Sequence, residues 1–439
     1  MLRRPLCLLL LLLASAAHAE SPGEEAFRNA IDWTVQVRTS VNQPFAEDEQ
    51  GTWFGAGLLV DAGRGWVLTN AHVAGRSYGK VSIAFKDNRT VPAQRVYVDP
   101  YLDLAVLAYD PRRVPAKTSV PVLDCGPPPP VGHPVGAFGH PWGFRYTGTR
   151  GITSAVTTRL GSTMLQTDAP INEGNSGGPL ISLETGKVVG INAAKIKEEA
   201  VEGLSFAVPI RYACTVLELL EAGRDPSPPA RLVDFAMDEN DEQTMVVARS
   251  RLPAGSLDLR VGDVIESLPG IPTEIATETD LMDALRGRTR PVTLRVDRDG
   301  RKLDLQGSWP MAPKVTERRG IAISGALFAE AEPLTRGLVV GPPNLMVHYV
   351  EPGSTAESAG VMAFDLLVSA NHAPVDSLET LLQRARADAA ADRPLELVFL
   401  RLTSETQQEL FVHQRRLLPV EDTHPVGPAH QPSADTTGK

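Results

Sequence analysis

Gly174-Asn175-Ser176-Gly177-Gly178-Pro179-Leu180 places a single serine among three glycines. Glycine lets the backbone turn tightly, so that two N–H groups can converge on one point. A serine hydroxyl is a poor nucleophile at neutral pH and needs a neutral imidazole to accept its proton during attack. The run therefore predicts that Ser176 is a nucleophile and that the N–H groups of Gly174 and Ser176 form an oxyanion hole.

Two other segments supply the partners that such a serine requires. His72 lies in Leu68-Thr69-Asn70-Ala71-His72-Val73, which reads as the end of a strand running into a turn. Asp103 stands directly before the apolar run Leu104-Ala105-Val106-Leu107. We predict that His72 is the general base and then acid, and that Asp103 orients its imidazole. Asp99 and Asp110 compete for this role, but each precedes a proline, which is typical of turns.

The region around these residues has the pattern of a β protein. Residues 24 to 222 contain many short apolar runs separated by Gly, Asp-Pro and Pro-rich turns. This pattern predicts a mostly β domain, built as a barrel or a sandwich. A helix is expected from Ile210 to Ala222, where apolar residues recur at helical spacing and Gly223 follows. The Pro-rich residues 223–230 read as a linker.

Two similar blocks follow, at residues 231–308 and 320–418, with a linker at residues 309–319 between them. In each block a turn and a strand precede a helix, expected at residues 279–285 and 378–387, and a last strand follows. The repeated order predicts a duplicated small α+β domain. The tail, residues 419–439, is rich in Pro, His, Asp and Thr, and we expect it to be disordered.

The first 19 residues read as a secretory signal peptide. They start with the basic pair Arg3-Arg4, continue with the apolar run from Leu6 to Leu13, and end in Ala17-His18-Ala19. No other apolar stretch is long enough to cross a bilayer, so we expect no integral membrane segment in the mature chain. The predicted location is therefore the periplasm or another extracytoplasmic compartment.

Charge and cysteine content narrow the range of partners. The formal net charge is −10, and removal of the two leader arginines makes it −12, which argues against a nucleic-acid partner. No Cys/His cluster has metal-ligand spacing, and we expect neither a metal nor a cofactor. Only Cys125 and Cys214 remain after the leader, and they can form either a disulfide or two separate thiols.

The quoted segments resemble those of trypsin-like serine proteases of the HtrA (Deg) family. The signature segments correspond to residues 69–73, 103–107 and 174–180, and weaker matches at residues 139–143 and 203–209 keep the family's order. The resemblance implies a chymotrypsin/trypsin-like double β-barrel followed by two small α+β PDZ-like domains. It also implies ATP-independent cleavage of unfolded or misfolded envelope proteins by a homo-oligomer, a trimer or multiples of it.

Substrate contacts are predicted at two places. Pro170, Ile171, Ile191 and Ala193 are expected to line the side-chain pocket, which has no acid at its base. The run Gly320-Ile321-Ala322-Ile323 is the candidate for a PDZ carboxylate-binding loop in the second block.

Two features depart from the family's pattern. Glu173 adds a negative charge beside Gly174, and the segment between Val41 and Gly51 is short for the family's first long loop.

The main alternative is a proteolytically idle, PDZ-based peptide-binding scaffold or holding chaperone. The three catalytic residue types and the oxyanion glycines argue for the enzyme instead. An esterase is disfavoured because the chain lacks a Gly-x-Ser-x-Gly elbow on a strand–turn–helix, and its order is His, Asp, Ser. We therefore expect a serine endopeptidase.

Overall fold

The computed structural model describes residues 21–113, 119–141, 145–158, 162–195, 204–237, 244–271, 275–331, 345–405 and 408–428. The predicted signal peptide, residues 1–19, lies outside these ranges. So do Trp142 and Gly143 of the segment 139–143, Gly203 of the segment 203–209, and residues 429–439 of the predicted tail. The described α-helices are α1 (Pro22–Trp33), α2 (Ala71–Ala74), α3 (Ile210–Glu221), α4 (Glu278–Ala284), α6 (Thr355–Ser358) and α7 (Leu378–Ala390).

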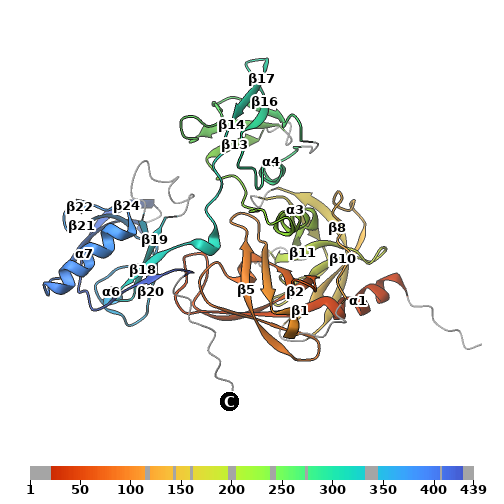
Figure 1. The fold of residues 1–439 in the computed structure, drawn as a ribbon, viewed down its shortest axis with the longest axis horizontal. Helices are drawn as coiled ribbons and strands as arrows, with labels where there is room; N and C mark the ends of the chain where they lie inside the picture. The colour runs from red at the N-terminus through yellow and green to blue at the C-terminus, as the bar shows by residue number, and fades with distance from the viewer. Residues whose placement is uncertain are drawn as a thin grey trace, which may run out of the picture.

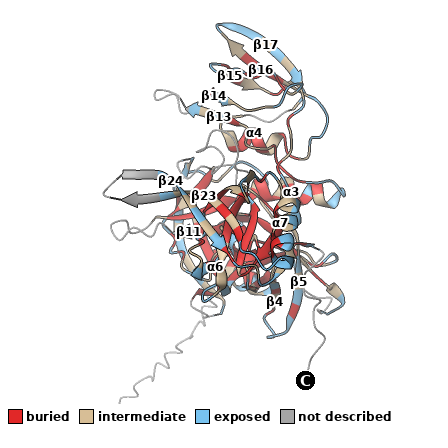
Figure 2. Cartoon of the chain, turned by 90° about the vertical axis from the view of Figure 1, so that its left-hand side faces the viewer, coloured by how far each residue is buried: buried red, intermediate tan, exposed pale blue. Residues whose placement is uncertain are grey.

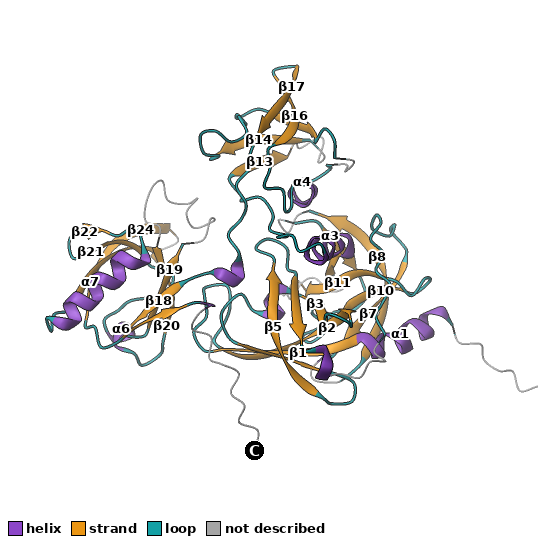
Figure 3. Cartoon of the chain, in the orientation of Figure 1, coloured by secondary structure: helices purple, strands orange, loops and turns teal. Residues whose placement is uncertain are grey.

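Two closed six-stranded barrels form the first part of the chain (Figure 3). The first has the order β1-β2-β3-β6-β5-β4, and the second β10-β11-β12-β9-β8-β7. Their strands are β1 (Thr34–Val41), β2 (Gly51–Asp61), β3 (Trp66–Thr69), β4 (Lys80–Ala84), β5 (Thr90–Val98), β6 (Ala105–Tyr109), β7 (Pro134–Gly139), β8 (Thr147–Thr157), β9 (Met164–Thr167), β10 (Pro179–Ser182), β11 (Val188–Lys195) and β12 (Ser205–Pro209). The predicted double β-barrel is confirmed.

Apolar alternation explains the barrel walls. In β1 the side chains of Val35, Val37 and Thr39 are buried, whereas the intervening Arg38 is exposed. This is the pattern of a strand with one face on a core and one on solvent. Strand β12 is buried along its whole length, because α3 packs against β11 and β12. Figure 2 shows that buried residues gather inside the barrels.

Helices α1 and α3, which begin and end the protease part, both pack against strands of the second barrel. Helix α3 matches the predicted helix from residue 210 to 222 to within one residue. Helix α1 was not predicted; it starts with a capping box between Ser21 and Glu24, and its Phe27 stacks on Phe138 of β7 at 5.8 Å. A disulfide joins Cys125 to Cys214 of α3 across 89 positions of sequence. The sequence left open whether these cysteines form a disulfide or two separate thiols, and the structure shows the disulfide.

The first PDZ-like unit is a five-stranded sheet with helix α4, as expected for the first repeated block (Figure 1). Its strands run in sequence order: β13 (Val233–Met237), β14 (Met245–Ser250), β15 (Val264–Ser267), β16 (Val292–Arg298) and β17 (Arg301–Gly307). Figure 1 shows α4 facing α3 of the protease part, so this unit approaches the barrels through its helix.

The second PDZ-like unit is an eight-stranded sheet with helices α6 and α7. Its path runs β24-β23-β21-β20-β19-β18-β25, and β22 pairs with β21. The strands are β18 (Gly320–Ile323), β19 (Ala326–Glu330), β20 (Leu345–Val350), β21 (Leu366–Ala370), β22 (Ala373–Pro374), β23 (Leu395–Glu405), β24 (Gln408–Leu418) and β25 (Thr423–Val426). Both units therefore contain the strands and the helix that the repeat predicted.

Two predictions about this unit are wrong. Gly320-Ile321-Ala322-Ile323 is not a loop but strand β18, which pairs with β19 on one side and β25 on the other. Because a central strand uses its N–H groups in both ladders, these residues cannot hold a terminal carboxylate as a loop would. Residues 423–426, assigned to a disordered tail, form β25, since pairing with β18 supplies the order that the segment's composition does not.

A loop of the first barrel, residues 42–48, packs against the second PDZ-like unit and the segment before it. Phe45 is fully buried against Leu327 and Ala329 of β19. Glu47 and Arg318 form a bidentate ion pair at 2.6 and 2.8 Å.

Within the described residues, no helix is both long and apolar enough to cross a membrane.

Candidate active site

His72 and Asp103 meet because of the strand order of the first barrel. His72 follows β3 and lies on the short helix α2, while Asp103 lies just before β6. Strands β3 and β6 pair antiparallel, with Thr69 opposite Ala105. The end of one strand is therefore beside the start of the other. The imidazole Nδ1 lies 2.6 Å from Asp103 Oδ2, and the His72 N–H donates to Oδ1 at 2.9 Å.

Asp103 is held as a carboxylate. Burial alone would raise its pKa, but the hydrogen bonds and charge of His72 and the charge of Arg76 outweigh it and lower the pKa of Asp103. The Asn70 side chain also donates to the Asp103 carbonyl at 2.8 Å. An ionised carboxylate on Nδ1 leaves Nε2 as the lone-pair nitrogen, which is the tautomer that a general base needs.

Helix α2 is fixed by donors from three strands of the first barrel. The Trp53 indole donates to the His72 carbonyl at 3.0 Å, the Thr39 hydroxyl to the Val73 carbonyl at 2.7 Å, and the Arg95 guanidinium to the Ala74 carbonyl at 2.8 Å. These bonds satisfy carbonyls that a four-residue helix leaves free. The backbone of α2 is thus held by the first barrel in addition to the bond from the His72 N–H to Asp103.

Ser176 reaches the first barrel through its backbone. Its carbonyl accepts the Ala56 N–H of β2 at 2.7 Å. A Cβ built on the neighbouring Gly55 would lie 2.6 Å from Val73 and 2.9 Å from the Ser176 carbonyl oxygen. Helix α2 and the serine loop therefore lie on either side of Gly55. Within the described residues the Ser176 hydroxyl donates to the Ala193 carbonyl at 3.1 Å, not to His72.

The glycines around Ser176 are required by space as well as by backbone angle. Gly177 has φ +83°, and a Cβ there would lie 2.1 Å from the Ala56 carbonyl oxygen. Gly174 has φ +98°, and its carbonyl accepts the His140 N–H at 3.1 Å. Neither the Gly174 N–H nor the Ser176 N–H donates to another residue that the structure describes. Both amides are therefore free to bind an oxyanion.

The four residues predicted to line the side-chain pocket differ in their surroundings, and the pocket stays a prediction. Ile171 is buried in the second barrel's own core, and Ile191 in the main core of the protease part. Pro170 is exposed, and Ala193 touches the site through the carbonyl that accepts the Ser176 hydroxyl. Ile171 lies in the loop between β9 and β10, and Ile191 lies on β11.

One neighbour of the site was not given a role from the sequence. His140 is 2 % exposed, and its backbone contacts Gly174. Burial, with the charge of Arg145, lowers the pKa of His140 to about 4. Its ring stays neutral at physiological pH and packs edge-on to Tyr146 at 4.9 Å. The sequence pointed to His140 through its position in the segment 139–143, which resembles the family's pattern.

A double β-barrel that places a carboxylate–imidazole pair beside a glycine-rich serine loop defines a trypsin-like serine protease. Residues 55–191 match the family model described as "Trypsin-like peptidase domain". The chain is 31% identical over 366 residues to the "Probable periplasmic serine endoprotease DegP-like" of Halomonas elongata, covering 76% of this chain and 73% of that one. It therefore belongs to the HtrA/Deg family, and it is a serine endopeptidase.

Two further relatives agree. The "Serine protease Do-like HtrA" of Lactococcus lactis strain IL1403 is 34% identical over 285 residues, covering 56% of this chain and 68% of the relative. The solved structure "HtrA-type protease AlgW with tripeptide" superposes with a TM-score of 0.52 at 27% identity, covering 65% of this chain and 97% of the other. Since similar proteins are named periplasmic, an extracytoplasmic location is supported.

Proposed function

We propose that the chain cleaves peptide bonds through Ser176, His72 and Asp103, by way of an acyl-enzyme intermediate. The observation that carries the proposal is the contact of His72 Nδ1 with Asp103 at 2.6 Å, beside a serine loop bonded to β2. A base oriented by a carboxylate next to a serine is the arrangement that acyl transfer needs.

Acylation starts with the Ser176 hydroxyl bonded to the Ala193 carbonyl. The hydroxyl leaves the Ala193 carbonyl by rotation about its Cα–Cβ bond and donates to Nε2 of His72. The oxygen then attacks the substrate carbonyl carbon, the proton passes to Nε2, and Asp103 stabilises the imidazolium. The N–H groups of Gly174 and Ser176 receive the negative charge on the substrate oxygen, and each such donor is worth about 10²–10³ in rate.

The remaining steps reverse the proton's path. The tetrahedral intermediate collapses, the carbon–nitrogen bond breaks, and the imidazolium gives its proton to the departing amine. Water then loses a proton to His72 and attacks the acyl carbon; the ester bond to Ser176 breaks, and His72 returns the proton to the serine oxygen. Neither a metal nor a cofactor takes part in this scheme.

The substrates that we propose are unfolded or misfolded proteins of the cell envelope. The leader-like residues 1–19, the DegP-like relatives and the two PDZ-like units support this choice. We propose the periplasm as the location and a homo-oligomer, a trimer or multiples of it, as the assembly, which light scattering of the purified protein measures.

The test compares purified protein with its Ser176→Ala variant. We expect the wild type to degrade β-casein and to react with a fluorophosphonate, and the variant to do neither. Degradation that persists in Ser176→Ala would contradict the assignment of the nucleophile. A wild type that binds casein but never cleaves it would favour the alternative function, a peptide-binding scaffold or holding chaperone.

A further inference from the structure

The turn that carries Asp103 is shaped by a second carboxylate. Asp99 is fully buried, and its Oδ1 accepts the N–H groups of Tyr101 at 2.8 Å and Leu102 at 2.7 Å. The Asp99 N–H donates to the Leu104 carbonyl at 2.9 Å, which closes the turn. Asp103 therefore lies on a turn whose two ends are both bonded to Asp99, in agreement with the turn role expected from the sequence.

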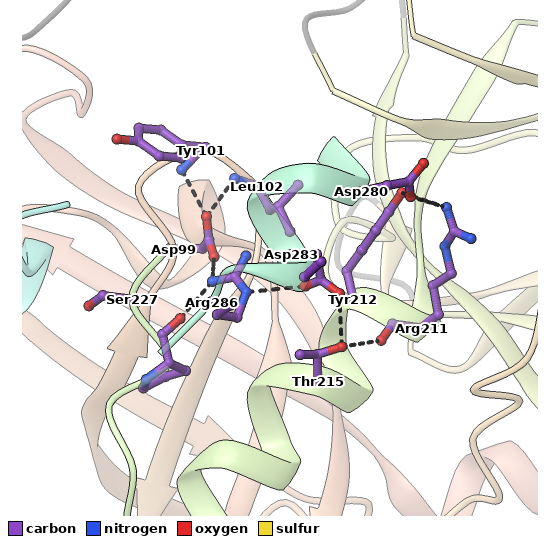
Figure 4. A network of polar contacts seen from close by, with 12 residues as sticks. Asp99, Tyr101, Leu102, Arg211, Tyr212, Thr215, Ser227, Asp280, Asp283 and Arg286 are labelled. Carbon is purple, nitrogen blue, oxygen red and sulfur yellow. Dashed lines mark hydrogen bonds and ion pairs between the residues drawn. The ribbon is translucent and has the colours of Figure 1, made fainter. Parts of the chain in front are cut away.

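The other oxygen of Asp99, Oδ2, accepts the Tyr97 hydroxyl of β5 at 2.8 Å and is also bound by the first PDZ-like unit (Figure 4). Arg286, just beyond α4, places Nη1 2.7 Å from Asp99 Oδ2. The side chains are 2 % and 0 % exposed. Arg286 also donates to the Tyr97 hydroxyl and the Pro226 carbonyl, both at 2.8 Å.

A pair of this kind depends on both partners. Burial opposes the Arg286 charge, but Asp99, Tyr97 and Asp283 outweigh burial and raise the pKa of Arg286. Removal of the arginine alone would leave the Asp99 carboxylate charged in a dry interior, which is far more damaging than removal of both charges. Without the arginine, Oδ2 loses its charged donor and keeps the Tyr97 hydroxyl, so the carboxylate that accepts the N–H groups of the turn is held less firmly.

We propose that Arg286 is a positioning residue for the Asp103 turn, so that the first PDZ-like unit completes the catalytic centre through Asp99. This inference rests on the proposed function of His72, Asp103 and Ser176. The unit acts as a structural part of the active site: Arg286 holds Asp99, Asp99 holds the turn, and the turn aims Asp103 at His72.

The same interface contains contacts that provide a control. Asp280 of α4 lies 2.7 Å from Arg211 and 3.0 Å from the Tyr212 hydroxyl of α3. Thr215 of α3 donates to Asp283 at 2.9 Å. Figure 4 shows Asp280 and Arg211 away from the Asp99 turn, whereas Asp283 also accepts the Arg286 guanidinium at 3.1 Å. Asp280→Asn therefore weakens docking of the unit without touching the turn.

The experiment measures peptide hydrolysis by the full chain with Arg286→Met, Asp99→Asn, both together, and Asp280→Asn. We expect Arg286→Met to lower kcat between about 10-fold and about 100-fold with KM little changed, as a misplaced catalytic group does. The acid limb of its kcat/KM profile should move to lower pH, because the imidazolium loses part of its carboxylate partner. The double variant should recover activity relative to Arg286→Met, and Asp280→Asn should stay within about twofold of wild type.

Three results would overturn the proposal. They are a folded Arg286→Met with wild-type kcat and pH profile, an equal loss in Asp280→Asn, and a double variant no better than Arg286→Met. If Arg286→Met does not fold, Arg286→Lys decides: the charge without the planar fork should give an intermediate kcat, and a wild-type value refutes the proposal. Hydrolysis that is absent from wild type or independent of Ser176 is a different result, which sinks the proposed function itself.

Discussion

Replacement of His348 by Asn should remove part of the protein's sensitivity to acid. His348 lies on β20 and is 3 % exposed. Its Nε2 donates to the Glu330 carbonyl at 3.0 Å, so its Nδ1 must accept the Ala46 N–H, which lies at 3.1 Å. Protonation of Nδ1 would bring two donors face to face. Asn at this position can keep an acceptor for Ala46 but cannot take up a proton.

The magnitude follows from the pKa of His348. Burial first, and then the charge of Arg318, lower the pKa to about 4, although the Glu330 carbonyl and the charge of Glu47 act in the opposite direction. An unfolded histidine has a pKa of about 6.5. Between these values the unfolded chain binds a proton that the folded chain does not, so stability falls as pH falls. The slope is about 1.4 kcal/mol per pH unit, and the total between pH 7.5 and pH 4 is about 3 kcal/mol.

The assay is urea denaturation followed by circular dichroism at several pH values between 7.5 and 4. The unfolding free energy of wild type minus that of His348→Asn should fall by about 3 kcal/mol from pH 7.5 to pH 4, whatever its value at pH 7.5. His372→Asn is the control, because the side chain of His372 in the same unit is 81 % exposed. The reasoning is refuted if wild type and His348→Asn lose stability in parallel, or if NMR finds His348 protonated at pH 5.5.

Three more outcomes are expected. Asp103→Asn should lower kcat by about 10⁴-fold while the protein stays folded, because the imidazole then takes the wrong tautomer; unchanged kcat would contradict its role. Gly177→Ala should lower the unfolding free energy by more than about 3 kcal/mol and abolish activity, since its Cβ would overlap a β2 carbonyl, whereas Gly186→Ala, with φ +70° and nothing within 4 Å, should lose only about 1 kcal/mol. The double variant Cys125→Ser/Cys214→Ser should lose about 4.5 kcal/mol of stability if the chain-entropy estimate for an 89-residue separation holds, and melting curves with and without reductant check this.

Local chemistry made much of the site predictable. The serine loop passes close to another backbone and therefore needs glycines beside Ser176. These glycines can be recognised in the sequence alone. His72 and Asp103 could be named because each follows or precedes an apolar run that had to be a strand. Helix α3 was predictable from its spacing and its following glycine.

The errors have a different origin, because they concern which side of a segment faces which neighbour. To predict that residues 320–323 form strand β18, one would have to know its partner β25, a four-residue strand about 100 positions later that contains Pro425. Arg286 follows a helix as many solvated arginines do, and only the fold brings it to Asp99.

The strand β25 also decides how the sheet of the second PDZ-like unit can meet other polypeptides. Without β25, the main-chain groups along the outer side of β18 would be available to any extended segment that came close. Pro425 has no N–H to offer a further strand, and the opposite border, β24, carries the exposed Arg415. Strand β25 therefore closes one border of this sheet to pairing with a further extended chain.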